Sequence, residues 1–196
     1  MTAGLSISKH FNMKKLPLSF YNRSTIKVAQ NLLGKFLIRR IGSQKISGKI
    51  VETEAYCGPN DLASHAAKGR TNRTSVMFGP AGYIYVYLIY GMYYCLNIVT
   101  EKKDYPAAVL IRAVEIPDNP RIASGPGKLC RYFQIDKKLN NQPIIGTQLW
   151  VKDYGLKINS AQIIKTPRIG VDYAGEKYRN KPWRFYLKNS PAVSRR

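Results

Sequence analysis

Strict alternation of apolar and polar or aromatic residues is the strongest pattern along this chain. Between residues 83 and 88, tyrosines take every second position and aliphatic residues fill the positions between them. This period of two is typical of a half-buried strand. Comparable runs predict the following strands: Lys35–Arg40, Lys45–Tyr56, Tyr83–Tyr90, Tyr93–Val99, Ala107–Ile116, Gln148–Lys152, Ile163–Ile169 and Arg184–Leu187.

Helical periodicity is rarer and does not alternate with the strands. Ser24 fits an N-cap for a helix that ends at Gly34 and carries four apolar residues on one side, namely Ile26, Ala29, Leu32 and Leu33. Short helices are predicted at Asp61–Ala67 and Lys128–Gln134. Without regular strand–helix alternation, we expect an α+β fold, with a curved, mainly antiparallel sheet and flanking helices. We interpret residues 1–16 as a flexible basic leader and residues 17–196 as a single domain.

The charge of the chain narrows the choice of partners. It has 32 Lys and Arg residues against 11 Asp and Glu residues, a net charge of +21. Basic pairs are scattered along the chain, which favours a patch assembled by folding over a disordered basic tail. Such an excess of positive charge indicates that the partner is a phosphate backbone or an anionic membrane surface. The apolar run at residues 83–99 alternates and is short for a membrane span, and no signal peptide is visible. We therefore expect an intracellular protein that associates with nucleic acid.

Metal and cofactor motifs are missing from the sequence. Cys57, Cys95 and Cys130 are far apart and form no C-x-x-C pair, so we expect reduced thiols. His10 and His65 are the only histidines, which argues against a zinc cluster. Walker, G-x-G-x-x-G and nucleophile-elbow patterns are not found. We expect neither a metal nor a cofactor.

Two of the few acids lie in one apolar strand. Glu52, Glu54 and Tyr56 share a face of that strand, because alternate residues point the same way. Arg112 sits at the centre of another apolar strand, where it needs a partner or a site, and Glu54 is the natural partner. Such a pair could hold a water, with the carboxylate as a general base, but a plain structural ion pair would give the same sequence.

The turn between residues 90 and 92 carries two large apolar side chains. Gly91 can adopt positive φ there, so a hairpin is predicted. Tyr90 and Met92 at an exposed tip are unfavourable unless they insert into something, and wedging between base steps is one known use of such residues. The neighbouring tyrosines either pack in the core or sandwich an unstacked base.

Several long motifs occur together and in one order. They are VETEAYCGPNDLASH at 51–65, YVYLIYGMY at 85–93, CLN at 95–97, SGPGKL at 124–129, RIGV at 168–171, AG at 174–175 and RFY at 184–186. From about residue 17 to its end, the chain closely resembles the alkyladenine (3-methyladenine) DNA glycosylase family. The resemblance implies a base-excision repair enzyme that flips damaged purines out of double-stranded DNA and excises them.

The resemblance also assigns the catalytic residues. Glu54 corresponds to the general base that activates water, and Arg112 together with the main-chain carbonyl of Ile169 corresponds to the groups that hold this water. The implied enzyme is monofunctional and needs no metal. We expect it to act as a monomer on DNA containing 3-methyladenine, hypoxanthine or ethenoadenine.

The base pocket follows from the same resemblance. Tyr56 and Tyr87 correspond to rings that stack on the flipped base, with His65 beside it. Asn97 corresponds to the residue that crowds the exocyclic amino group of normal guanine. Electron-rich rings attract a cationic base by about 0.5–2 kcal/mol, so we expect only modest discrimination from stacking.

In the hairpin, Tyr90 corresponds to the side chain that fills the gap left in the duplex, with Met92 near it. Two departures from the family pattern stand out. Two residues are added around Glu101–Tyr105, and Tyr94 replaces an expected phenylalanine. Neither departure involves a residue of the implied chemistry, but with both present the resemblance does not define the DNA contacts in detail.

Two alternatives remain on sequence grounds. A non-catalytic nucleic-acid-binding protein explains the charge and the tyrosines, but gives no reason for Glu54 opposite Arg112. A bifunctional glycosylase/lyase needs an amine nucleophile in the pocket. No lysine lies in the motifs expected to line it, and Lys128 is the nearest candidate. Neutral leaving bases need protonation, and the sequence shows no donor for it.

Overall fold

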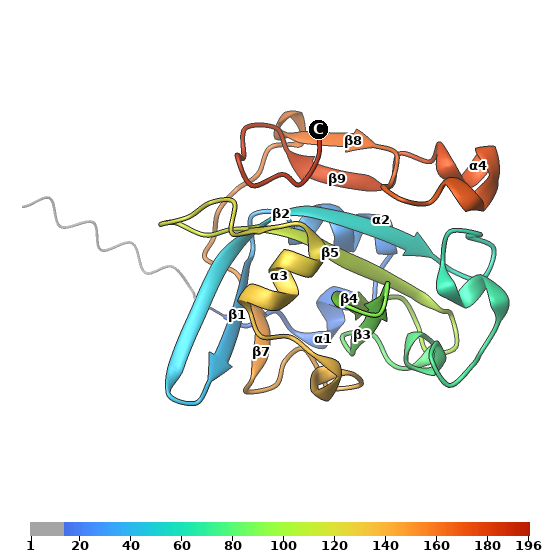
Figure 1. The fold of residues 1–196 in the computed structure, drawn as a ribbon, viewed down its shortest axis with the longest axis horizontal. Helices are drawn as coiled ribbons and strands as arrows, with labels where there is room; N and C mark the ends of the chain where they lie inside the picture. Colours follow the sequence, from blue (N-terminus) through green and yellow to red (C-terminus); the bar gives the residue numbers. More distant parts are fainter. Residues whose placement is uncertain (1–13) are drawn as a thin grey trace, which may run out of the picture.

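The structure is built around one β-sheet, with short helices packed against it (Figure 1). The computed structural model describes residues 14–196, and within them nine strands join one sheet in which all paired strands are antiparallel. The strands are β1 (Phe36–Ile41), β2 (Gln44–Cys57), β3 (Ile84–Ile89), β4 (Tyr93–Val99), β5 (Ala107–Glu115), β6 (Ala123–Ser124), β7 (Leu149–Lys152), β8 (Ile163–Thr166) and β9 (Arg184–Leu187). The main order is β3-β4-β5-β2-β1-β7. The predicted α+β class with an antiparallel sheet is confirmed.

Helices are short throughout the described chain, and none is long and apolar enough to cross a membrane. The α-helices are α1 (Leu18–Tyr21), α2 (Thr25–Leu32), α3 (Pro126–Tyr132) and α4 (Gly175–Arg179); single 3₁₀ turns lie at His65–Lys68, Ser75–Phe78, Lys137–Leu139, Ser160–Gln162 and Asp172–Ala174. The helix expected after Ser24 is confirmed as α2. The helix expected at Lys128–Gln134 begins two residues earlier, because Pro126 fits the first helical turn. The helix expected at Asp61–Ala67 is wrong, since only the 3₁₀ turn forms there.

Strand β2 is the centre of the sheet. Its 14 residues pair with β5 on one edge, while β1 and then β9 share the other edge. The β2–β5 register shifts around Glu52, which marks a bulge at this residue. Val51 and Thr53 face α2, where the Thr53 hydroxyl donates to the Ala29 carbonyl at 2.9 Å. Glu52 and Glu54 therefore lie together on the other face, as the alternation predicted.

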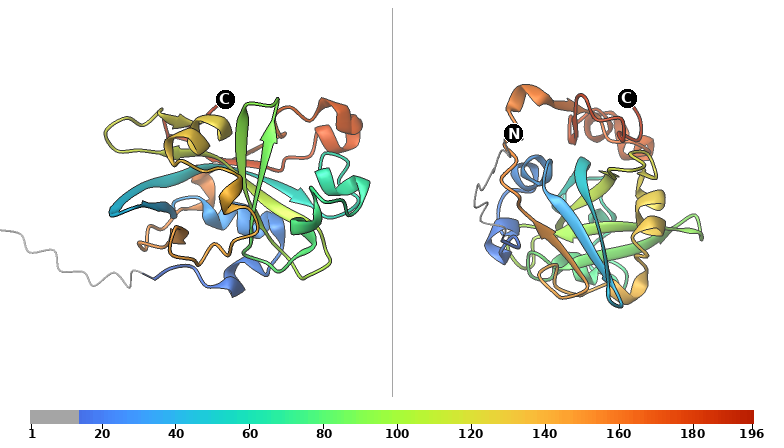
Figure 2. Two further views of the ribbon diagram at one scale, coloured as in Figure 1. Left: turned by 60° about the horizontal axis from the view of Figure 1, so that its bottom comes forward. Right: turned by 90° about the vertical axis from the view of Figure 1, so that its left-hand side faces the viewer.

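Helices α2 and α3 cover opposite faces of the sheet (Figure 2). Val28 and Leu32 of α2, Leu129 of α3 and Phe133, which directly follows α3, are fully buried against it. Each such side chain contributes about 1.5–3 kcal/mol by leaving water. Strand β5 packs against both helices and β2 packs against α2, which fixes the residues that these strands carry.

The β3–β4 hairpin projects from the body of the protein (Figure 2). Its turn is closed by a hydrogen bond from the Met92 amide to the Ile89 carbonyl, at 3.2 Å. Tyr90 and Gly91 both have positive φ, 53° and 68°, so the positive φ predicted for Gly91 is confirmed. The Tyr90 side chain is 82% exposed and that of Met92 is 65% exposed. Tyr90 is thus not a core residue.

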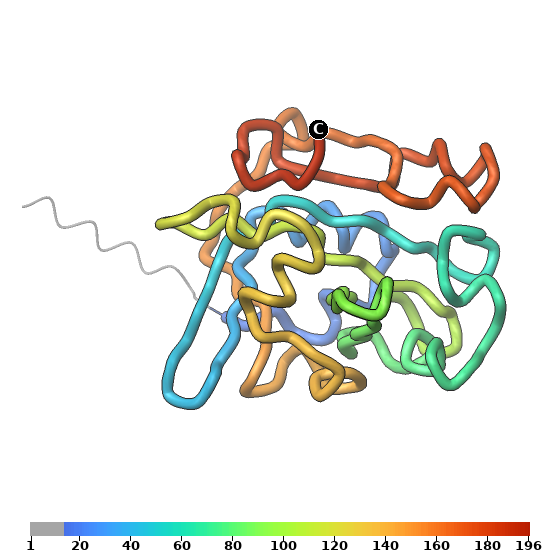
Figure 3. Tube along the Cα trace, in the orientation of Figure 1, coloured from blue at the N-terminus to red at the C-terminus, as the bar shows by residue number. Residues whose placement is uncertain are grey.

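Both ends of the described chain lie along the sheet. Residues 1–13 of the predicted leader fall outside the described residues, whereas Lys15 bridges to Lys152 and the Leu16 amide donates to the Val151 carbonyl of β7. After β9 the chain turns back over β2 (Figure 3). There the Ser194 amide donates to Glu52 at 2.7 Å.

Candidate active site

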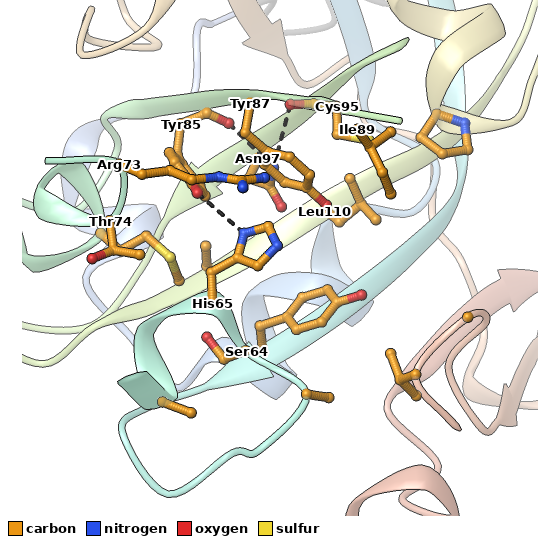
Figure 4. Close-up of a pocket in the computed structure, with 18 of the residues that line it drawn as sticks. Ser64, His65, Arg73, Thr74, Tyr85, Tyr87, Ile89, Cys95, Asn97 and Leu110 are labelled. Atoms are coloured by element: carbon orange, nitrogen blue, oxygen red, sulfur yellow. Dashed lines mark hydrogen bonds between the residues drawn. The ribbon is translucent and has the colours of Figure 1, made fainter. Parts of the chain in front are cut away.

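A cavity of about 930 Å³ opens beside the β3–β4 hairpin (Figure 4). Its walls come from the end of β2, the segment of residues 62–77, strands β3 to β5 and the loop of residues 169–173. Of the predicted site residues, those that line it are Tyr56, His65, Tyr87, Tyr90, Asn97, Arg112 and Ile169. Met92 does not line the cavity, and Glu54 lies directly behind its wall. The fold thus gathers these residues, which are far apart in the sequence, around one space.

Glu54 is fully buried and held by three neighbours. Its Oε2 accepts from the Tyr56 hydroxyl at 2.9 Å, and its Oε1 accepts from the Ile169 amide at 2.8 Å. The Arg112 Nη1 lies 3.4 Å from Oε1. A carboxylate has about four acceptor positions, so this arrangement leaves room for one more donor, such as a water.

Arg112 joins the two glutamates of β2. Its Nε donates to the Glu52 Oε1 at 3.2 Å, in addition to its ion pair with Glu54. Burial alone lowers the pKa of Arg112, but Glu54 and Glu52 outweigh burial and raise it above its usual value. The guanidinium is therefore a fixed positive charge. The predicted pairing of Arg112 with Glu54 is confirmed, and Glu52 is a second partner.

Glu52 is the centre of a buried charge cluster that was not predicted from the sequence. It accepts from Arg112, from the Arg184 Nη1 at 2.8 Å and from the Ser194 amide at 2.7 Å. Arg184 comes from β9 and also donates to the Arg195 carbonyl at 2.7 Å. The one available signal was that both glutamates share a strand face, so that a single arginine could reach both.

Aromatic side chains form the walls in front of Glu54. Burial raises the pKa of Tyr87 and, with a further contribution from Glu54, that of Tyr56, so both hydroxyls stay protonated. The His65 ring contacts Tyr87 edge to face with centroids 4.5 Å apart, and its Nδ1 lies 3.1 Å from the Tyr85 hydroxyl. Tyr85 also lines the cavity, although it was not among the predicted site residues.

His65 is neutral in this site. Burial, followed by the nearby charges of Arg73 and Lys68, lowers its pKa from 6.5 to about 4. A histidine with this pKa is an uncharged imidazole at neutral pH, which is too weak an acid to protonate a leaving base. His65 therefore does not supply the proton that a neutral leaving base needs.

Each of the two predicted stacking rings has an arginine over it. The Arg168 Cζ lies 4.8 Å from the centre of the Tyr56 ring, and the Arg73 Cζ lies 5.3 Å from that of Tyr87. Arg168 is held by two hydrogen bonds to Asp61, at 2.5 and 2.8 Å, and both side chains are fully buried. Neither arginine was predicted as a site residue.

Asn97 is buried at the back of the cavity. Its Nδ2 donates to the carbonyls of Tyr85 at 3.2 Å and Cys95 at 3.4 Å, which fixes the orientation of the amide. Lys68 lies outside the motifs that were expected to line the pocket, yet it lines the cavity, whereas Lys128, the candidate named from the sequence, does not. Lys68 is the last residue of the 3₁₀ turn His65–Lys68, where a helix ending at Ala67 was predicted.

Metal-binding side chains do not gather in the described part of the chain. Residues 14–196 contain no group of three or more His, Cys, Asp or Glu side chains placed to hold an ion. Cys57, Cys95 and Cys130 are free thiols.

Comparison with known proteins gives the family. A family model described as methylpurine-DNA glycosylase (MPG) matches residues 19–191. The chain belongs to this family. It is 51% identical over 199 residues to a protein of Methanocella arvoryzae, covering 94% of this chain and 98% of the relative. It is 50% identical to a protein of Legionella pneumophila strain Corby, covering 93% and 100%, and 44% identical to one of Alkaliphilus oremlandii, also covering 93% and 100%.

All three relatives carry the name "Putative 3-methyladenine DNA glycosylase". As a methylpurine-DNA glycosylase, the chain is an enzyme of DNA repair that acts on DNA. The resemblance seen in its motifs is confirmed, and the alternative of a non-catalytic binding protein is set aside.

Proposed function

We propose that this methylpurine-DNA glycosylase flips alkylated or deaminated purines out of duplex DNA and hydrolyses their N-glycosidic bond without cutting the strand. The proposed substrates are bases of the 3-methyladenine, hypoxanthine and ethenoadenine class. The observation that carries the proposal is the buried Glu54 behind an aromatic cavity, held by Arg112 and Ile169.

In the proposed reaction Glu54 is the general base. The N-glycosidic bond breaks through an oxocarbenium-like state, much as a sugar–sugar bond does. Glu54 accepts a proton from the attacking water and stabilises the positive charge that develops on the sugar. Arg112 and the carbonyl of Ile169 position that water. The Ile169 amide already bonds to Glu54, which brings the same peptide segment beside the carboxylate.

The cavity is large enough to receive an extruded base. Small-molecule pockets range from about 300 to 1,000 Å³, and this one has about 930 Å³. Tyr56 and Tyr87 stack on the base, and His65 lies beside it. Asn97, fixed by its two carbonyl partners, crowds the exocyclic amino group of normal guanine and so excludes it.

The β3–β4 hairpin is the proposed DNA-inserting element. Tyr90 lines the mouth of the cavity and is the most exposed large apolar residue described. Its ring fills the space left by the extruded nucleotide, and Met92 contacts the neighbouring base step. Filling this gap offsets the few kcal/mol that unstacking costs.

A lyase activity is the second candidate, because Lys68 lines the cavity. An amine could attack the sugar and form a Schiff base before the strand is cut. Lys68 is exposed, whereas a lysine activated as a nucleophile is usually desolvated in an apolar pocket. We favour the hydrolytic route, in which water is the nucleophile.

The test is an excision assay on a labelled duplex with one hypoxanthine, run with and without alkali, in a chelator. Strand cleavage that appears only after alkali supports base removal by water. Cleavage without alkali, or trapping of a protein–DNA adduct by borohydride, would establish the lyase instead. Loss of activity in the chelator would contradict the metal-free reaction.

A further inference from the structure

Positive charge is concentrated on the cavity wall. Among the described residues that line it, Lys68, Arg73 and Arg112 are basic and none is Asp or Glu. Arg112 is balanced by Glu52 and Glu54 behind the wall. Arg73 takes part in none of the ion pairs formed within residues 14–196.

Arg73 lies among the side chains proposed to surround the base. Figure 4 shows it beside Tyr85 and Tyr87. Its guanidinium stacks over the Tyr87 ring and donates to the Leu88 carbonyl at 3.3 Å. The position is therefore defined by contacts on strand β3, although Arg73 is exposed.

Both proposed stacking rings already carry a cation. Arg168 lies over Tyr56 and Arg73 over Tyr87. A ring attracts a cation through its quadrupole, but a second cation at the same ring is repelled by the first. The arrangement runs against the expectation that these rings favour a cationic base. Because Arg168 is neutralised by Asp61, Arg73 contributes the uncompensated charge.

We infer that Arg73 is a specificity-determining residue that favours neutral purine lesions over cationic ones; this inference rests on the proposed function. When the bond between the sugar carbon and the base nitrogen breaks, both electrons go to the base. A neutral base then becomes negative, whereas a base that begins as a cation leaves neutral. The fixed charge of Arg73 stabilises the developing negative charge of the first kind and repels the starting charge of the second.

The inference also accounts for a site without an evident acid. His65 is neutral, and Tyr56 and Tyr87 hold their protons firmly. Since none of these three groups is ready to protonate a neutral leaving base, the guanidinium of Arg73 offers another means of stabilising it. Arg73 thus assists hypoxanthine in particular, because this base departs as an anion unless it is protonated.

The experiment compares single-turnover excision of hypoxanthine and of 7-methylguanine, placed at one position of the same duplex. The proteins are the wild type, Arg73→Gln, Arg73→Lys and the control Arg70→Gln. Arg70 is an exposed arginine of the same segment that stacks on Phe78, outside the cavity. Saturating enzyme removes differences in DNA affinity, and the ratio of the two rates removes any effect shared by both lesions.

We expect Arg73→Gln to lower the hypoxanthine to 7-methylguanine ratio about tenfold, equivalent to about 1.4 kcal/mol. Arg73→Lys should stay within about threefold of the wild-type ratio, and Arg70→Gln should leave it unchanged. An unchanged ratio in Arg73→Gln, or an equal shift in Arg70→Gln, would overturn the inference and leave the proposed function intact. If the wild type excised neither base, the result would contradict the proposed function itself, and with it the inference about Arg73.

Discussion

Glu52 and Glu54 are two residues apart and equally buried, yet we expect opposite consequences when each is replaced by glutamine. The replacement keeps the shape, removes the charge, and exchanges one acceptor oxygen for a donor NH₂ group. The neighbours of the two carboxylates decide whether that new donor finds an acceptor.

At Glu52 every neighbour is a donor. Arg112 and Arg184 donate to Oε1, and the Ser194 amide donates to Oε2. An NH₂ group at either position would meet an N–H with no acceptor, and the buried arginines would lose a compensating charge. Breaking a buried ion pair by removing one partner costs about 3–5 kcal/mol. For a chain of this size, 1 kcal/mol shifts the melting temperature by about 2–4 °C, so Glu52→Gln should melt about 6–20 °C lower.

At Glu54 the introduced amide can be accommodated. The Tyr56 hydroxyl that donates to Oε2 can rotate and accept instead, while the other oxygen keeps its bond from the Ile169 amide. Arg112 still has Glu52 as a partner. Glu54→Gln should therefore melt within a few degrees of the wild type. Its single-turnover excision should fall by about 10²–10⁴-fold, the usual contribution of a general base.

Thermal melting and single-turnover excision measured on the same preparations provide the check. The excision of Glu52→Gln is compared at a temperature where the variant is still folded. Melting of Glu52→Gln within about 2 °C of the wild type would refute the reasoning on the cluster. An excision rate of Glu54→Gln within about tenfold of the wild type would refute its role as the base.

Three further outcomes follow from the structure. Tyr90→Ser should melt like the wild type, because the ring is exposed, but should flip an ethenoadenine poorly, as base fluorescence would show; lost stability with normal flipping would contradict this. Affinity for undamaged duplex should fall with salt at a log–log slope steeper than about −3 between 50 and 200 mM, and a slope near zero would exclude a basic DNA interface. Because the pKa of His65 is lowered to about 4, its contribution to stability is complete above pH 6.5 and declines toward pH 4. Between pH 6.5 and 5, His65→Gln should thus lose less stability than the wild type, and parallel melting curves would contradict the shift.

Most strands could be predicted from the sequence, because alternation is a local signal. β4 and β9 have the predicted bounds, six others differ by a few residues at their ends, and the two-residue β6 was not predicted. The strand expected at Ile163–Ile169 stops at Thr166, because Pro167 offers no amide to the ladder and Arg168 turns away to bind Asp61. One-turn helices such as α1 and α4 were missed, since so few residues show no periodicity.

In the candidate site too, the residues that a local pattern marks could be predicted, whereas contacts between distant residues could not. Glu54, Arg112 and the tyrosines stand out where they are, as charged or aromatic residues in apolar strands. The contacts of Glu52 with Arg184 and Ser194 join residues more than 130 positions apart, and no local pattern encodes them. The same holds for Arg73, whose stacking on Tyr87 depends on how a loop folds against β3.

The backbone of Tyr90 has a consequence for engineering this protein. A left-handed conformation at φ 53° suits glycine or asparagine far better than an aromatic residue. A thermostability screen is therefore expected to enrich Tyr90→Gly or Tyr90→Asn, which relieve the turn while deleting the side chain proposed to enter DNA. Libraries selected for heat resistance alone would accumulate robust but inactive enzymes, so selection should be coupled to repair of damaged DNA.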